Sequence, residues 1–452
     1  MTNDELRQKK FSMICLGCDK NKVDSEKMTF LLQNYGLTYT NNLDEANIII
    51  INTCAFINDA KKESIDTILE TAQLKNKERG ENLEKLIVCG CLAQRYYDEV
   101  KTGFDEVDAV VRLKNNEQIV KIVKTLYGVD TLTEDRVKNS KLKRTISTPK
   151  YYAYLKISDG CNNCCSYCTI PKIRGRFTSV PPKDLVNEAK QLVKSGVREL
   201  ILVAQDVTNY GADLFGKPML VELIRELSKI KKLKWIRLHY CYPHLIDDAL
   251  LKEIETNEKV CKYLDIPMQH ASDNVLKAMN RKDTLEQYNI LLDKIRKLKV
   301  FVAIRSTFIV GFPGETKEDF NTLKQFLIDQ KMQYVGFFKY SREEYTVAYG
   351  LPHQVSEHTK EARLQEIQAL QQEIMFKSQE RFVGSTVLSV LERVEDDGTY
   401  VLRNQYNSPN IDTVIYATSD KKLEVGEFYK VKITGLEGID LKGEILWIYQ
   451  TN

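Results

Sequence analysis

Four cysteines within the eight residues 161–168 form the densest group of reactive side chains in this sequence. Cys161, Cys165 and Cys168 follow the order C-x3-C-x2-C, directly after an apolar run at 152–157 that predicts a strand. Three thiolates on one short loop can hold three irons of a four-iron, four-sulfur cluster, and a fourth protein ligand would close the site. No fourth cysteine stands at ferredoxin spacing, and no second ligand pair stands at zinc-knuckle spacing. The pattern therefore predicts a cluster with one open iron.

The first part of the chain alternates apolar strand-like runs with helical patterns. We expect strands at 11–16, 47–52 and 86–90, and helices at 21–36 and 58–75. Continuous β-branched runs are typical of parallel strands that are buried on both faces. The fold class of this part is therefore α/β, with an open parallel sheet.

Each of these three predicted strands is followed by a cysteine, namely Cys18, Cys54 or Cys91. Open α/β sheets place their binding sites beyond the carboxyl ends of the strands, so we expect these side chains to converge. A second three-cysteine cluster is the functional interpretation, and buried cysteine as a small core residue is the alternative. Cys15 and Cys89 lie inside strands, and for these two we predict core positions.

The details of the helix at 21–36 are also predictable. Asp24 or Ser25 can cap its amino end, and Gly36 is expected to end it.

Beyond Tyr151, strands and helices alternate regularly. Six β/α units predict a partial parallel barrel that carries its chemistry on the loops after the strands. Gly311 and Gly314 follow the fifth strand, where glycine lets backbone approach a nucleoside closely, although a plain loop explains the pair equally well. The six strand-like runs are 152–158, 199–205, 235–240, 263–269, 301–310 and 335–340, with helices at 183–195 and 316–330 among those between them.

A long helical segment at 357–380 precedes five short β runs with turn signals, which predict a small antiparallel β-barrel. The β runs are 386–391, 400–403, 413–416, 428–433 and 441–448. The domain boundaries that follow are 1–130, a polar linker at 131–150, 151–380 and 381–452.

The cysteine motif with Tyr167 before its last cysteine resembles the signature of the radical S-adenosylmethionine enzymes. The resemblance implies that the open iron binds S-adenosylmethionine and that Tyr167 lies against its adenine. Gly311 and Gly314 are then candidates for the same binding site. In such enzymes the cofactor carries the hard chemistry.

The whole constellation resembles the methylthiotransferases, including their carboxy-terminal TRAM barrel. That resemblance implies two 4Fe-4S clusters, with Cys18, Cys54 and Cys91 holding an auxiliary cluster that delivers sulfur. S-adenosylmethionine would be both methyl donor and radical source, and a C–H bond would become C–S–CH3. The amino-terminal motifs that carry the resemblance are Leu16-Gly17-Cys18, Asn52-Thr53-Cys54 and Gly90-Cys91-Leu92-Ala93-Gln94-Arg95.

The chain is most similar to the branch that modifies the β-carbon of an aspartate in small-subunit ribosomal protein twelve. Asp19, Tyr345 and Asn410 depart from that branch, where proline, glycine and glutamate are usual. The alternative is methylthiolation of adenosine in transfer RNA, and a non-catalytic iron–sulfur carrier is a further one. The motifs of this branch are 16–25, 202–206, 238–243, 264–272, 340–344 and 408–412.

The charge of the carboxy-terminal segment bears on this choice. Residues 381–452 contain eight basic and eleven acidic residues, a net charge of −3. A barrel that binds RNA should be basic, whereas an acidic one suits a basic ribosomal protein.

The composition is that of an ordinary globular protein, with a net charge of +3 over 452 residues. No secretory signal or long apolar run is evident, so we expect a cytoplasmic protein without membrane contact, in which eleven cysteines serve metal ligation rather than disulfides. The resemblance also implies an electron donor such as a flavodoxin or ferredoxin. The sequence assigns no role to Cys164, Cys241, Cys261, His239 and His270.

Overall fold

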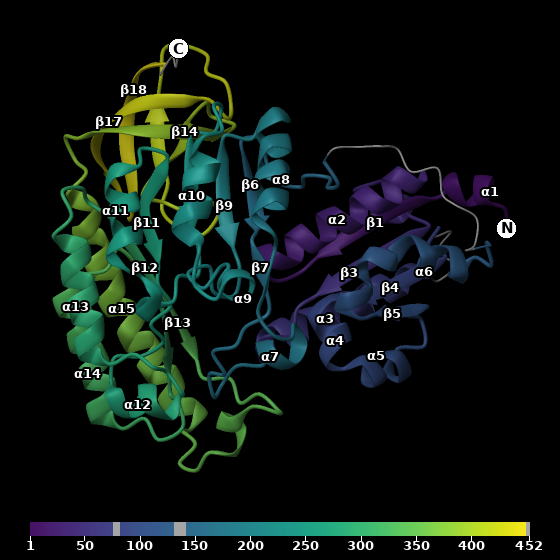
Figure 1. Ribbon diagram of the computed structural model, residues 1–452, viewed down its shortest axis with the longest axis horizontal. Coiled ribbons are helices and arrows are strands. Elements are labelled where there is room, and N and C mark those ends of the chain that lie inside the picture. Colours follow the sequence, from purple (N-terminus) through teal and green to yellow (C-terminus); the bar gives the residue numbers. More distant parts are fainter. Residues whose placement is uncertain (76–81, 131–141, 449–452) are drawn as a thin grey trace. The chain divides into compact units, whose positions relative to one another are not determined.

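The computed structural model describes residues 1–75, 82–130 and 142–448 (Figure 1). The chain forms two compact units. The first unit contains Met1–Thr148, Asp159–Asn162 and Cys168–Thr178, and the second contains Pro149–Ser158, Asn163–Tyr167 and Ser179–Asn452. Residues 131–141 of the predicted linker lie outside the described residues. None of the described helices is both long and apolar enough to cross a membrane.

The first unit is built on a five-stranded parallel sheet in the order β2-β1-β3-β4-β5. All six residues of β3 are buried, as expected for the central strand of a sheet covered on both faces. The predicted open parallel sheet is confirmed, with two short edge strands that the sequence pattern did not indicate. The strands are β1 (Lys10–Cys15), β2 (Thr38–Tyr39), β3 (Ile48–Thr53), β4 (Lys85–Cys89) and β5 (Ala109–Val111). The helices are α1 (Asn3–Arg7), α2 (Asp19–Tyr35), α3 (Asn58–Ala72), α4 (Gly90–Arg95), α5 (Tyr97–Gly103), α6 (Ile119–Leu126) and α7 (Ile170–Ile173).

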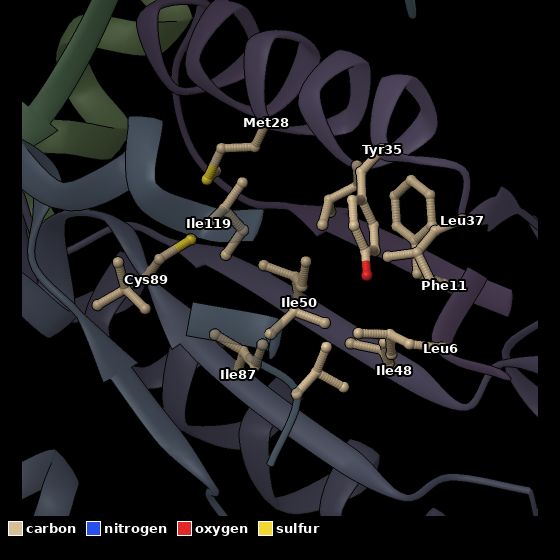
Figure 2. Close-up of a cluster of buried hydrophobic side chains, with 14 residues drawn as sticks. Leu6, Phe11, Met28, Tyr35, Leu37, Ile48, Ile50, Ile87, Cys89 and Ile119 are labelled. Carbon is tan, nitrogen blue, oxygen red and sulfur yellow. The ribbon is translucent and has the colours of Figure 1, made fainter. Parts of the chain in front are cut away.

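One apolar cluster of this sheet contains Cys89 (Figure 2). Cys89 is fully buried among Met28, Ile87 and Ile119, so its predicted core position is confirmed. The same prediction for Cys15 is wrong. Cys15 is the last residue of β1 and is exposed, although Phe11 and Ser12 of the same strand are buried.

The predicted amino-terminal caps of α2 are also wrong. Cys18 occupies the N-cap position and makes no side-chain cap hydrogen bond, whereas Asp24 and Ser25 lie buried inside the helix. Gly36 is the C-cap, with φ at 126°, as predicted.

The second unit contains a six-stranded parallel sheet in the order β13-β12-β11-β10-β9-β6. This arrangement confirms the predicted partial barrel. β11 ends at Asp265 rather than at 269, because Pro267 cannot donate a ladder hydrogen bond. The strands are β6 (Tyr152–Lys156), β9 (Glu199–Val203), β10 (Trp235–Leu238), β11 (Val260–Asp265), β12 (Ala303–Val310) and β13 (Tyr334–Lys339). The helices are α8 (Pro182–Lys194), α9 (Ala212–Phe215), α10 (Leu220–Ser228), α11 (Asp248–Thr256), α12 (Asp273–Ala278), α13 (Leu285–Arg296), α14 (Lys317–Gln330) and α15 (Glu357–Glu380).

The same unit ends in a closed five-stranded barrel, β14-β15-β16-β18-β17. Its neighbouring strands are antiparallel except for β16 and β18, which run parallel. The predicted small barrel is thus confirmed, with one parallel pair in place of a fully antiparallel arrangement. Its strands are β14 (Thr386–Val394), β15 (Tyr400–Asn404), β16 (Ile415–Thr418), β17 (Phe428–Glu437) and β18 (Asp440–Ile448).

The closed barrel lies at the end of the six-stranded sheet where the strands begin (Figure 1). Trp235, the first residue of β10, packs edge-on against Phe428 with the ring centroids 4.8 Å apart. Arg403 donates to the carboxylate of Glu199, the first residue of β9, at 2.5 Å. The loop after each strand therefore opens at the other end of the sheet, away from the closed barrel.

The loop between β15 and β16 inserts among the inward-facing side chains of the six-stranded sheet. Asp412 accepts from the Tyr263 hydroxyl and from Arg305, both at 2.8 Å. His239 Nε2 lies 2.8 Å from the Ser408 hydroxyl. The sequence assigned no structural role to the motif at 408–412. In the structure this motif lies in the interior of the partial barrel.

Candidate metal centres

Cys18, Cys54 and Cys91 follow three neighbouring strands of the first unit, and the fold brings them together at the carboxyl edge of the sheet. Cys18 is the N-cap of α2, Cys54 follows β3 directly, and Cys91 is the second residue of α4. A Cβ atom built on Gly17 would lie 2.9 Å from Cys54 Sγ. Asn21 links the other segments, since its amide donates to the Thr53 carbonyl at 3.0 Å and its Oδ1 lies 3.8 Å from Cys91 Sγ.

Two glycines shape the cradle around these sulfurs. Gly17 and Gly90 adopt φ values of 84° and 91°, which side chains rarely tolerate. A Cβ atom on Gly90 would lie 2.3 Å from Asn52 Oδ1, a buried oxygen for which the structure gives no hydrogen-bond donor. Backbone is therefore packed closely against Cys54 and against the strand end that precedes Cys91.

The donor set fits an iron–sulfur cluster. Burial raises the pKa of Cys54 and raises that of Cys91 to about 12, although the nearby Arg174 guanidinium acts in the opposite direction on both. Without metal the two thiols are neutral, so metal binding must displace their protons. No set of three or more Cys, His, Asp or Glu side chains in the described parts of the chain could hold a metal ion as the side chains stand. A four-iron cluster is larger than a single ion and keeps its ligand sulfurs further apart.

The loop at 161–168 carries the other predicted ligands. Its two ends belong to the first unit, together with α7. The Cys161 N–H donates to the Gly175 carbonyl at 3.2 Å, and the Ile170 N–H, at the start of α7, donates to Cys168 Sγ at 3.4 Å. A backbone N–H directed at a cysteine sulfur is the kind of contact that stabilises a thiolate ligand.

The middle of this loop belongs to the second unit, with Cys165 at its centre. Ser166 anchors it, because the Ser166 N–H donates to the Met279 carbonyl at 2.9 Å and the Ser166 carbonyl accepts from the Ala348 N–H at 2.8 Å. Tyr167 packs edge-on against Phe312, with ring centroids 6.5 Å apart. The middle of the loop is thus fixed beside the segments that follow α12 and β13, at the carboxyl end of the partial barrel.

Phe312 belongs to the glycine-containing loop after β12. The Glu315 carboxylate accepts the N–H groups of Gly311 and Phe312 at 2.6 and 3.1 Å, and it pairs with Arg363 at 2.6 Å. A Cβ atom on Gly311 would lie 2.3 Å from Lys360 Cγ on α15, so close helix packing already requires glycine there. At Gly314, with φ at 82°, a Cβ atom would meet nothing within 4 Å. Gly314 is therefore the glycine of this pair with open space beside it.

His239 and His270, to which the sequence assigns no role, both have structural roles. His239 is buried, and its Nε2 contacts the Ser408 hydroxyl of the inserted loop. His270 is fully buried, and its Nδ1 accepts from the Ser272 N–H at 3.0 Å. Burial lowers the pKa of His270 to about 3, so the ring is neutral at physiological pH. A neutral, enclosed imidazole is a poor proton donor to a substrate.

Among the described residues, the remaining cysteines form no third set of metal donors. Cys241 and Cys261 are fully buried, and burial raises the pKa of both. Cys164 is exposed, with φ at 51°, and its carbonyl accepts from the Asn280 side chain at 2.9 Å.

Sequence reasoning missed the polar residues that support the first cysteine set, chiefly Asn21 and Arg174. Their signal was present but ambiguous, since Asn21 stands three residues after Cys18 and Arg174 six residues after Cys168. A single Asn or Arg near a cysteine is too common to be assigned a role without coordinates.

Three family models match the sequence. The Radical SAM superfamily matches residues 155–327, Uncharacterized protein family UPF0004 matches 10–112, and the TRAM domain matches 383–446. Between them these models include both cysteine sets and the closed barrel.

Full-length relatives extend the match to nearly the whole chain. It is 46% identical over 454 residues to the protein named ribosomal protein uS12 methylthiotransferase RimO in Acetivibrio thermocellus, covering 97% of this chain and 99% of that one. A protein of the same name in Thermoanaerobacter sp. is 43% identical over 440 residues, covering 96% and 100%.

Solved structures share the fold. The radical S-adenosylmethionine methyltransferase TsrM from Kitasatospora setae, with cobalamin and a 4Fe-4S cluster bound, superposes with a TM-score of 0.54 at 14% identity. The superposition covers 75% of this chain and 74% of that one.

Proposed function

The chain belongs to the ribosomal protein uS12 methylthiotransferase family, and we propose from this premise that it methylthiolates the β-carbon of an aspartate in that ribosomal protein. It is a radical S-adenosylmethionine enzyme that uses S-adenosylmethionine and 4Fe-4S clusters. The observation that carries the proposal is the full-length match together with two separate sets of three cysteines.

We assign the two cysteine sets to two clusters. Cys161, Cys165 and Cys168 would hold the cluster that binds S-adenosylmethionine, with Tyr167 and the open space beside Gly314 available to the nucleoside. The three cysteines of the first unit would hold the auxiliary cluster. When bound, these groups supply the radical chemistry, the methyl group and the sulfur.

The protein's own residues supply position and enclosure. Gly17 and Gly90 let backbone pack closely beside Cys54 and Cys91, which would hold the auxiliary cluster. At the other cluster, Ser166 fixes the centre of the ligand loop through both its N–H and its carbonyl. The Glu315 carboxylate holds the neighbouring loop through two N–H groups and Arg363. Such fixed geometry keeps reacting groups aligned.

The substrate assignment also has electrostatic support. The closed barrel is net acidic, and Asp396 and Asp420 are exposed at its surface. An acidic surface attracts a basic ribosomal protein and repels phosphate. Methylthiolation of transfer RNA is the alternative, which would place the same chemistry on an adenosine.

Three further assignments belong to the proposal. We propose three domains. Residues 1–130 would hold the auxiliary cluster, residues 151–380 would carry the radical chemistry, and residues 381–452 would contact the substrate. We expect a flavodoxin or ferredoxin as the electron donor. The enzyme would act in the cytoplasm, where ribosomal proteins are made.

Metal content tests the cluster assignment. Anaerobically reconstituted protein should hold about eight irons, corresponding to two four-iron clusters. Replacing Cys161, Cys165 and Cys168 by Ala should leave about four irons and abolish cleavage of S-adenosylmethionine. Production of 5′-deoxyadenosine by that variant would show that the assignment is wrong.

A further inference from the structure

Arg174 is the buried cation beside the auxiliary cysteines. Its side chain is only 2% exposed, and Nη2 lies 3.9 Å from Cys91 Sγ. The same nitrogen donates to Asn21 Oδ1. That oxygen in turn lies 3.8 Å from Cys91 Sγ. One guanidinium edge is therefore directed at the sulfur and at its polar neighbour together.

The other edge of the guanidinium is held by two carboxylates. Nη1 lies 3.2 Å from Asp24 Oδ2 on α2 and 2.9 Å from Asp159 Oδ2. Asp24 comes from the helix that begins at Cys18, and Asp159 precedes Cys161 by two residues. The planar fork thus has a fixed orientation, which a flexible point charge such as lysine could not reproduce.

We propose that Arg174 is a positioning residue for the auxiliary cluster: it holds a fixed positive charge against the Cys91 thiolate and so sets the cluster's reduction potential. Hydrogen bonds and net charge around cluster sulfurs are the main protein contributions to such potentials. The side chain is almost fully buried, so solvent screens this charge only weakly.

The sign of the effect follows from charge. Adding an electron makes the cluster more negative, and a neighbouring cation stabilises the reduced form more than the oxidised one. Arg174 should therefore raise the reduction potential. Its loss would also leave Asp24 and Asp159 beside the cluster without their shared cation, which lowers the potential further.

The inference rests on the proposed role of Cys18, Cys54 and Cys91 as ligands. The experiment tests this ligand assignment separately from the role of Arg174. The full-length chain with Cys161, Cys165 and Cys168 replaced by Ala isolates the auxiliary cluster. If this protein assembles no cluster, the ligand assignment fails, whatever Arg174 does. If it does assemble one, redox titration followed by electron paramagnetic resonance measures the potential that Arg174 is proposed to set.

Arg174→Gln in that background should shift the midpoint to lower potential, and Arg174→Lys should shift it less because the charge is kept. Arg144→Gln is the matched control, since Arg144 makes an ion pair with Glu26 of α2 in which both side chains are 1% exposed. It should leave the midpoint unchanged. An unchanged midpoint in Arg174→Gln would overturn the proposal.

Cluster loss is also informative. If Arg174→Gln assembles no cluster while Arg144→Gln and Arg174→Lys do, the role of the charge at this position is supported. Equal iron loss in Arg174→Gln and Arg144→Gln would show that each pair only supports the fold, and the proposal would be wrong.

Discussion

Buried ion pairs connect the partial barrel to the closed barrel. Their burial determines how much free energy of unfolding should be lost when one partner is removed. The Glu199 carboxylate accepts from Arg403 at 2.5 Å and from Arg237 at 2.7 Å, and all three side chains are at most 1% exposed. Burial alone would raise the pKa of Glu199, but the two guanidinium groups lower it below its usual value. The carboxylate is therefore charged, and its charge depends on both partners.

Arg403→Met removes one of these partners and keeps most of the side-chain volume. Glu199 would lose a buried cation, and Glu392, which Arg403 contacts at 2.8 Å, would lose its partner as well. Breaking a buried pair by removing one member costs about 3–5 kcal/mol. We expect a loss of this size in the free energy of unfolding.

Arg393→Met is the control in the same barrel. Arg393 pairs with Glu395 at 2.9 Å, but their side chains are 52% and 42% exposed. Exposed pairs contribute about 0–1 kcal/mol, so this change should have little effect. Urea unfolding of the apoprotein followed by tryptophan fluorescence suits the comparison, because Trp235 lies 5.7 Å from the Arg403 guanidinium carbon. Equal destabilisation by the two variants would refute the reasoning.

The same contacts determine whether removal of residues 381–452 can test substrate recognition. Sequence reasoning placed both cluster sites upstream of residue 381, which implied that removing 381–452 would spare cleavage of S-adenosylmethionine. The structure shows that removal would leave Glu199 without Arg403, and Arg305 without Asp412. Loss of all activity after truncation would therefore say nothing about substrate recognition.

Three further predictions concern the site, its stability and its substrate. Cys91→Ala should lose the auxiliary cluster yet still cleave S-adenosylmethionine, and Cys89→Ala, in the neighbouring core, should retain both clusters; iron content and 5′-deoxyadenosine analysis check this. The pKa of His270 is lowered to about 3 in the folded protein. As the pH falls below ~6.5, only the unfolded chain binds a proton at this residue. The free energy of unfolding should therefore drop by ~2 kcal/mol between pH 7.5 and 5. His270→Gln should flatten that pH dependence in urea unfolding, and an unchanged slope would contradict it. Asp396→Lys with Asp420→Lys should weaken binding of the ribosomal protein most at low salt in a binding titration, and equal binding at every salt concentration would count against electrostatic recognition.

The regular elements were predictable because their local signals agree with the tertiary fold. The helix at 357–380 has the predicted bounds, and the isoleucine run of β3 became the fully buried central strand. Where the signals conflict, tertiary contacts decided the outcome. Asp24 has the residue type of a helix cap, but its carboxylate binds Arg174, a partner 150 residues away that no local pattern indicates.

The candidate site was predictable to the extent that its chemistry requires rare residues at fixed spacing. The cysteine sets satisfy that condition, and the topology rule for parallel strands placed Cys18, Cys54 and Cys91 at one edge. Arg174 and Asn21 do not satisfy it, because arginine and asparagine are common and act through long-range hydrogen bonds. The interior loop with Asp412 could not be predicted, since its partners come from two strands of another sheet.

A direct competition between substrates tests the proposed function most directly. Reconstituted enzyme, S-adenosylmethionine and a reductant would be incubated with ribosomal protein uS12 and transfer RNA, and both products analysed by mass spectrometry. We predict one added methylthio group on an aspartate of the ribosomal protein and none on the RNA. Methylthiolated transfer RNA beside unmodified ribosomal protein would contradict the substrate assignment and leave the cluster chemistry intact.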